Sequence, residues 1–202
     1  MEEINKAQRR HEVREQVARL TDALGMPIDD GILETVVSLN VLGIHTTGSC
    51  AGHLDHGQAA PWVDIGDPEA HPLARVARLK LLAVDQARRR GASAEERQTL
   101  QSAADQAELA VKRLHLVERA KLLQVLDLFY QQHYTPADRR LIINTKEWTG
   151  MSRLESQGAD FQTVAPPDER ATKLTEYQEE MQAFTTFLKS LEKSSCDALM
   201  NC

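Results

Sequence analysis

The chain has 202 residues and a formal net charge of −6 at pH 7; 42% of its residues are hydrophobic and only 4% are aromatic. This composition suffices for one hydrophobic core, and the negative charge argues against a protein that coats nucleic acid without sequence preference. No segment approaches the roughly 20 apolar residues of a membrane-spanning helix, so no membrane partner is expected. The charged start at Met1-Glu2-Glu3 and three cysteines without a disulfide framework indicate a cytoplasmic protein.

Two helices are predicted in the first part of the chain. The first covers about residues 3–24, where apolar residues recur at helical spacing, and Gly25 ends it. The second has Asp29 or Asp30 as its N-cap and ends at Gly43. Because this second helix is apolar on two faces, we expect it to be buried.

Reactive side chains are concentrated in residues 43–57, which read Gly-Ile-His-Thr-Thr-Gly-Ser-Cys-Ala-Gly-His-Leu-Asp-His-Gly. We expect a glycine-rich loop at the edge of a small sheet, entered by a short β-compatible run at Thr46-Thr47 and followed by a strand at 61–65. Loops in such positions often carry functional residues. This stretch is therefore the candidate site.

Two long helices joined by a tight turn are predicted within residues 68–134. Gly91 ends the first, and the capping box Ser93-Ala94-Glu95-Glu96 begins the second, which meets no glycine or proline before Pro136. The second helix would be about 60 Å long. The pair should form an antiparallel hairpin that lies over the sheet or projects from it. We expect its alternating charges to pair within the hairpin and not to form a strip for RNA phosphates.

Strands are predicted again after Pro136, at residues 140–145 and about 153–161, with a turn at Trp148-Thr149-Gly150. Five residues of this region would complete a ligand pocket if these strands adjoin the loop. They are Asn144, Lys146, Trp148, Arg153 and Glu155.

The last helix begins at Pro166-Pro167-Asp168 and carries apolar residues at alternating spacings of three and four. They are Leu174, Tyr177, Met181, Phe184, Leu188 and Leu191. Such a seam is typical of a coiled coil or bundle. It is either a homodimer interface or the surface that packs on the protein's own helices. The second interpretation is favoured, since the seam spans fewer than three heptads beside other long helices.

One interpretation of the candidate loop is a metal site. Cys50, His53 and His56 have two residues between neighbours, and thiolate and imidazole are zinc ligands. Asp64, water or substrate would fill the fourth position. The same three residues are the candidate catalytic groups, with Cys50 as a nucleophile and a histidine as general acid or base. The alternative for Cys50 is a small buried packing residue.

A second interpretation is an anion site built from hydroxyl groups and backbone amides, which would point toward one phosphate or carboxylate. Trp62 would stack on a base or ring, or would instead cap the core. The candidate ligand-binding residues are Thr46, Thr47, Gly48, Ser49, Gly52, Asp55, Trp62 and Asp64.

The run Gly-Ile-His-Thr-Thr-Gly-Ser-Cys-Ala-Gly-His after a helix resembles the Thr-Thr-Ser-Ser-Cys-Ser-Gly-Arg signature of the wybutosine-synthesis tRNA methyltransferase family. It is also similar to a group of uncharacterised bacterial and phage proteins with a Ser-Cys-x-Gly-His loop before a Pro-aromatic-x-Asp-Ile strand, here residues 61–65. The first resemblance implies a small α+β fold, a nucleotide-related ligand at the loop and S-adenosylmethionine as cofactor. Where that family has arginine, this chain has His53.

The sequence as a whole predicts an α+β protein of one domain, residues 1–202. A small mixed sheet is flanked by N- and C-terminal helices, and the long antiparallel hairpin, residues 68–134, is inserted. The predicted function is binding of a small anionic or nucleotide-like ligand at the loop, with or without catalysis. The alternatives are a zinc-dependent enzyme using Cys50, His53 and His56, and a helical interaction or oligomerisation protein without enzymatic activity.

Overall fold

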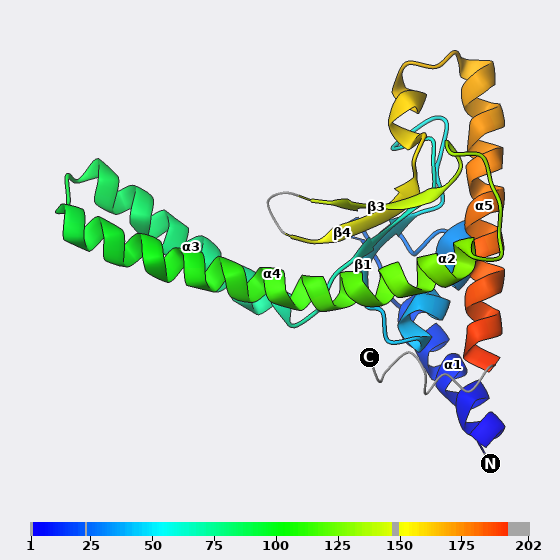
Figure 1. The fold of residues 1–202 in the computed structure, drawn as a ribbon, viewed down its shortest axis with the longest axis horizontal. Helices are drawn as coiled ribbons and strands as arrows, with labels where there is room; N and C mark the ends of the chain where they lie inside the picture. Colours follow the sequence, from blue (N-terminus) through cyan, green and yellow to red (C-terminus); the bar gives the residue numbers. More distant parts are fainter. Residues whose placement is uncertain (1, 23, 147–149, 194–202) are drawn as a thin grey trace.

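The computed structural model describes residues 2–22, 24–146 and 150–193 (Figure 1). In chain order its elements are α1 (Glu2–Ala18), α2 (Asp30–Val41), β1 (Thr46–Cys50), β2 (Trp62–Ile65), α3 (Ala70–Arg89), α4 (Ala94–Tyr130), β3 (Leu141–Thr145), β4 (Ser152–Ser156), the 3-10 helix η1 (Ala159–Thr163) and α5 (Pro167–Lys193). Long helices around one small sheet confirm the α+β class. None of the described helices combines the length and the apolar character that a membrane crossing needs.

The sheet has the strand order β1-β2-β4-β3, and each neighbouring pair is antiparallel. The expectation of a mixed sheet was therefore wrong. The physical reason is the length of the connections: β1 is joined to β2 through residues 51–61, and β3 to β4 through residues 146–151. Both connections are shorter than the dozen or more residues that a parallel crossover needs, so β1–β2 and β3–β4 each form an antiparallel hairpin.

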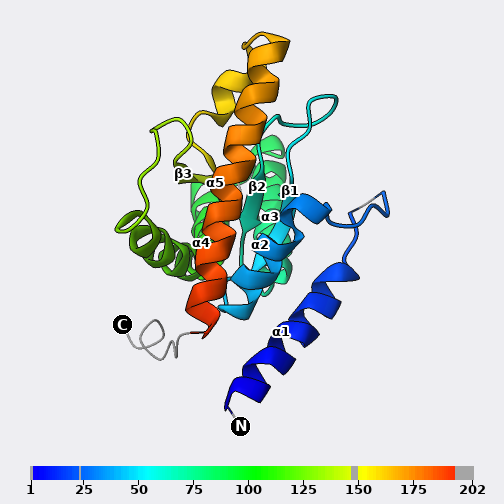
Figure 2. The ribbon, with the colours of Figure 1, turned by 90° about the vertical axis from the view of Figure 1, so that its right-hand side faces the viewer.

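The two faces of the sheet differ in character. Val63 and Leu154 are register partners with no solvent exposure, and they belong to the main core with residues of α2, α4 and α5. Figure 2 shows α2 and α5 lying in front of the strands on this side. Because side chains alternate along a strand, the neighbouring partners Asp64 and Arg153 lie on the opposite face. We call this opposite side the polar face.

The apolar seam of α5 lies inside the molecule. Its residues Leu174, Tyr177, Met181, Phe184 and Leu188 are all buried, and Leu191 packs against the main core. The seam thus contacts the chain's own helices, as the favoured interpretation predicted. Because these side chains are already covered, they are not available for a homodimer interface, and a homodimer through α5 stays a prediction.

The α3–α4 hairpin projects from the body of the protein (Figure 1). Helix α4 has 37 residues, and the hydroxyl of Ser93 accepts the N–H of Glu96 at 3.1 Å, which confirms Ser93 as its N-cap. Near the turn, Arg90 pairs with Glu96, in line with the expected pairing within the hairpin. The second half of α4 returns to the body, where Leu122 and Phe129 enter the main core.

Three predicted boundaries differ from the structure. The first helix ends at Ala18, because the carboxylate of Asp22 accepts the N–H groups of residues 24 and 26, both at 2.8 Å, and closes a turn. The candidate loop is a strand up to Cys50. The strand predicted at about 153–161 ends at Ser156 and is followed by η1. The predicted turn at Trp148-Thr149 lies outside the described residues.

Candidate functional site

The first half of the candidate loop is a strand, and this changes what its backbone can bind. Gly48, Ser49 and Cys50 pair with residues 64, 63 and 62 of β2. Because β1 is an edge strand, its amides point alternately toward β2 and away from it and not all toward one point, and anion binding by residues 46–49 stays a prediction. The hydroxyl of Thr46 accepts a hydrogen bond from the Asn40 side-chain amide at 2.8 Å.

Asp64 is the centre of a charged cluster on the polar face. Only 6% of the residue is exposed. Its carboxylate accepts hydrogen bonds from Arg153 Nε at 2.7 Å, Arg153 Nη2 at 3.0 Å and Lys146 Nζ at 2.6 Å. The Arg153 guanidinium also lies 3.7 Å from the centre of the Trp62 ring. Trp62 thus stacks on a cation of its own chain.

Glu155 forms a second polar cluster beside the first. It stands opposite Trp62 in the register and accepts hydrogen bonds from the Asn144 amide at 2.6 Å and the Gln58 amide at 3.1 Å. The strands that follow Pro136 therefore do adjoin the candidate loop. The condition for the expectation is met, but a ligand pocket completed by Asn144, Lys146, Arg153 and Glu155 stays a prediction, and Trp148 lies outside the described residues.

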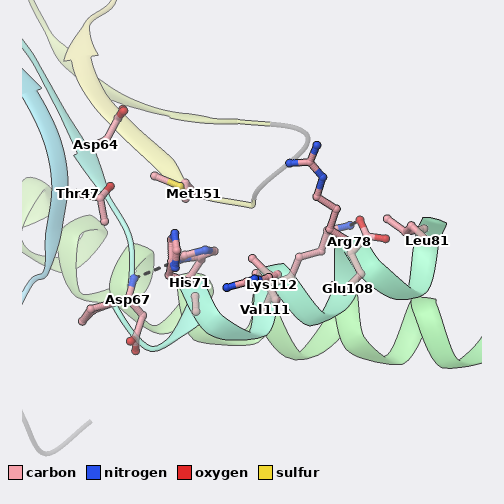
Figure 3. Close-up of a pocket in the computed structure, with 16 residues that line it drawn as sticks. Thr47, Asp64, Asp67, His71, Arg78, Leu81, Glu108, Val111, Lys112 and Met151 are labelled. Atoms are coloured by element: carbon pink, nitrogen blue, oxygen red, sulfur yellow. Dashed lines mark hydrogen bonds and ion pairs between the residues drawn. The ribbon is translucent and has the colours of Figure 1, made fainter. Parts of the chain in front are cut away.

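A pocket of about 1110 Å³ lies between the polar face and the α3–α4 hairpin (Figure 3). We call it the hairpin pocket. Two predicted site residues, Thr47 and Asp64, line it from the sheet. Its apolar lining comes mainly from the hairpin and consists of Pro68, Ala70, Ala74, Ala77, Leu81, Val111 and Met151. The remaining lining residues are Asp67, His71, Arg75, Arg78, Glu108, Lys112 and His115.

The charges around the hairpin pocket are unevenly paired. Asp64 is held by Arg153 and Lys146, as described above, and Glu108 lies 2.8 Å from the ammonium group of Lys112. Arg75 and Arg78, three residues apart on α3, make no ion pair within the described residues. Figure 3 shows the Arg78 side chain extending from the hairpin toward the sheet. Three acidic and three basic residues line the pocket, and of the basic ones Arg75 and Arg78 have no ion-pair partner within the described residues.

His115 lines this pocket and is buried, with only 5% of the residue exposed. Its Nδ1 accepts the backbone N–H of Asp67 at 3.3 Å, which leaves the proton of the neutral ring on Nε2. Burial lowers the pKa of His115 below its ordinary value, although the carboxylates of Asp67 and Glu118 oppose this shift. A Cβ atom on Gly66 would lie 3.1 Å from the ring, so this glycine lets the chain pass close to it.

A second group of functional side chains lies at the other end of β1. Ligand atoms of Asp29, Cys50 and His53 lie within 4.8 Å of one another. Asp29, one of the two predicted N-caps, is the N-cap residue of α2, but its side chain makes no capping bond. Its Oδ2 accepts the N–H of Ala51 at 2.9 Å and lies 3.1 Å from Nε2 of His53.

The environment of Cys50 does not activate it as a nucleophile. Burial raises the pKa of its thiol, and the neighbouring Asp29 carboxylate adds to this effect, while the N–H of Gly52 opposes it. Gly52 has a φ of +83°, and a Cβ atom there would lie 2.7 Å from the backbone of Ala60. Gly52 is therefore required to be glycine in this tight turn, and its ligand-binding role stays a prediction.

His56 belongs to a second, more exposed group with His53 and Asp55, whose ligand atoms also lie within 4.8 Å of one another. Its ring stacks on His53 with centroids 4.2 Å apart, and its Nδ1 lies 2.8 Å from the exposed carboxylate of Asp55. Asp64, the expected fourth zinc ligand, instead binds Arg153 and Lys146 on the polar face. Of the predicted residues, Thr47 and Asp64 line the hairpin pocket, Cys50 and His53 lie beside Asp29, and Asp55 and His56 lie beside His53.

Sequence reasoning missed the roles of five residues. It predicts Arg75 and Arg78 as charges that pair within the hairpin and His115 as a residue of the long helix, and it does not single out Lys112. Asp29 was noticed only as a cap. A signal existed in the basic character of α3, but no local pattern tells which arginines lack a partner.

No protein-family model, curated protein or solved structure matches the chain. The chemistry of the two sites is therefore argued from their geometry alone. The resemblance to the wybutosine-synthesis methyltransferases stays a prediction.

Proposed function

We propose that the protein binds a small amphipathic anion in the hairpin pocket. Such a ligand has an apolar or aromatic body and one phosphate or carboxylate group, a class that includes nucleotides. The observation that carries this proposal is the pair Arg75 and Arg78, which lack carboxylate partners within the described residues and line a largely apolar pocket.

The physical basis is a division of roles between the two kinds of lining. The alanine, leucine and valine side chains of the hairpin favour burial of an apolar body at about 25 cal/mol per Å² of covered surface. A guanidinium group can bind phosphate or carboxylate through two parallel hydrogen bonds. Hydrogen bonds to charged groups contribute about 1.5–3 kcal/mol each, so the arginines would set the preference for an anion.

The proposal keeps the ligand class that the sequence predicted, but the binding site is the hairpin pocket and not the 43–57 loop. One edge of β1 pairs with β2, and Trp62 of β2, the expected stacking residue, stacks on Arg153. Of the ligand-binding residues that the sequence predicted, Thr47 and Asp64 line the hairpin pocket.

Isothermal titration calorimetry tests the proposal with four probes: inorganic phosphate, adenosine 5′-monophosphate, benzoate and S-adenosylmethionine. We expect the probes that join an aromatic body to an anion, the monophosphate and benzoate, to bind more tightly than phosphate. The double substitution Arg75→Gln/Arg78→Gln should weaken binding by about 100-fold, which corresponds to roughly 2.8 kcal/mol. Binding should also weaken as ionic strength rises.

Arg89→Gln is the matched control, because Arg89 lies on the same helix but does not line the pocket. It should leave the affinity unchanged. Absence of binding by all four probes, or equal affinity in the double variant and the wild type, would contradict the proposal.

A further inference from the structure

The cluster of Asp29, Cys50 and His53 offers three chemically different metal ligands at one place. Their ligand atoms lie within 4.8 Å of one another, and all three residues are partly buried. The hairpin pocket does not include any of them. We propose that these three residues bind one divalent transition-metal ion of the zinc class.

The distances suit such an ion. Zinc bound at about 2.0 Å to nitrogen or oxygen and about 2.3 Å to sulfur holds tetrahedral neighbours about 3.5 Å apart. Asp29 Oδ2 and His53 Nε2 are already 3.1 Å apart, and the Cys50 sulfur lies within the 4.8 Å limit of both. Small side-chain rotations would complete the geometry.

The charges also suit a divalent ion. A carboxylate, a thiolate and a neutral imidazole together carry two negative charges, which balance the two positive charges of the metal. On binding, the Cys50 sulfur–hydrogen bond breaks, the sulfur lone pair forms the bond to the metal, and the proton passes to solvent. Three protein ligands leave a fourth position open, as in zinc sites that accept water or substrate.

The surrounding backbone holds the ligands in place before any ion binds. Cys50 ends β1, opposite Trp62 in the register. The N–H of Ala51 donates to Asp29, and the carbonyl of Ala51 accepts the Gln178 side-chain amide of α5 at 3.0 Å. The N–H of His53 donates to the carbonyl of Gln58 at 3.1 Å. Such outer contacts orient metal ligands and reduce the cost of ordering them.

This ligand set differs from the one that the sequence predicted, because Asp29 takes the place of His56. The His56 ring is exposed and hydrogen-bonded to Asp55, although it stacks on His53. A comparison of Asp29 and His56 variants therefore separates the two sets.

Titration of the metal-free full-length chain with Co²⁺ tests the inference, since Co²⁺ takes zinc sites and reports sulfur ligation by a charge-transfer band. Cys196→Ser and Cys202→Ser should be present throughout, so that Cys50 is the only thiol. We expect one equivalent of Co²⁺ to bind with the intense visible bands of tetrahedral coordination and with the charge-transfer band. Cys50→Ser should abolish that band, and Asp29→Asn and His53→Gln should each weaken binding about tenfold or more.

His56→Gln is the matched control and should bind Co²⁺ like the parent chain. Circular dichroism identifies any variant that fails to fold, and the parent titration decides the proposal without the variants. No Co²⁺ binding, binding without the charge-transfer band, or an equal loss in His56→Gln and Asp29→Asn would overturn it. The Arg75→Gln/Arg78→Gln chain should retain Co²⁺ binding, so failure of one proposal is distinguishable from failure of the other.

Discussion

Asp64 shows how a single buried carboxylate organises the polar face. It joins β2 to Arg153 of β4 and to Lys146, which directly follows β3. Three charge-assisted hydrogen bonds compensate its burial, so its negative charge is balanced within the chain. This leaves the free positive charge of the hairpin pocket on Arg75 and Arg78.

Asp64→Asn should destabilise the protein by about 3 kcal/mol, the lower end for a broken buried ion pair, since Lys146 and Arg153 are partly exposed. Two cations would then face each other without a counter-charge. Urea unfolding measures the change. Asp55→Asn, at an exposed position, is the matched control and should change the free energy of unfolding by about 0.5 kcal/mol or less. Equal effects of the two substitutions would contradict this role of Asp64.

Because the His115 ring is buried, we expect the stability of the protein to depend on pH. Burial lowers its pKa in the folded state, against the opposing carboxylates of Asp67 and Glu118, and its Nδ1 accepts a hydrogen bond that a protonated ring cannot accept. A lowered folded-state pKa means that the neutral ring stabilises the fold above the unfolded value of about 6.5, and that this contribution is lost as pH falls.

Comparison with His115→Gln isolates this contribution from the other histidines. The stability advantage of the wild type over this variant should be largest near pH 8 and should shrink toward pH 5, as measured by urea unfolding at each pH. An advantage that stays constant or grows on acidification would show that the ring is not kept neutral.

At the scale of the elements, a substitution in α5 tests whether its apolar seam belongs to the core. Phe184 has no solvent exposure and contacts the Phe129 ring, with centroids 5.3 Å apart. Phe184→Ala should therefore cost about 3–5 kcal/mol of stability without any change in oligomeric state by sedimentation. Phe161→Ala, at a residue that is 72% exposed, is the control and should have little effect. Dissociation of an oligomer without loss of stability would instead indicate an interface.

Elements with local signals were predictable from the sequence, and those that depend on distant pairing were not. The capping box at Ser93 placed the start of α4, because a cap is formed by residues close in sequence. The glycine and serine after Thr47 indicated a loop, yet pairing with β2 extends β1 to Cys50. Strand formation of this kind depends on a neighbour that local propensity does not reveal.

At the scale of the whole molecule, the hairpin pocket arises because the hairpin returns beside the sheet. One contact that fixes α4 there is Glu118, which is 2% exposed and accepts the backbone N–H of His45 at 2.7 Å and the ammonium group of Lys121 at 2.7 Å. The pocket combines residues 67–81 and 108–115 with two positions of the sheet. The sequence predicted the hairpin and two sheet residues, but not the angle that brings them together.

A backbone-amide NMR titration of the labelled chain with adenosine 5′-monophosphate tests the proposed pocket most directly. We expect shifts in three separate stretches, at residues 67–81, at 108–115 and around Thr47 and Asp64, and their loss in the Arg75→Gln/Arg78→Gln variant. Shifts confined to residues 50–57 around Cys50, or shifts that persist in the double variant, would contradict binding in the hairpin pocket.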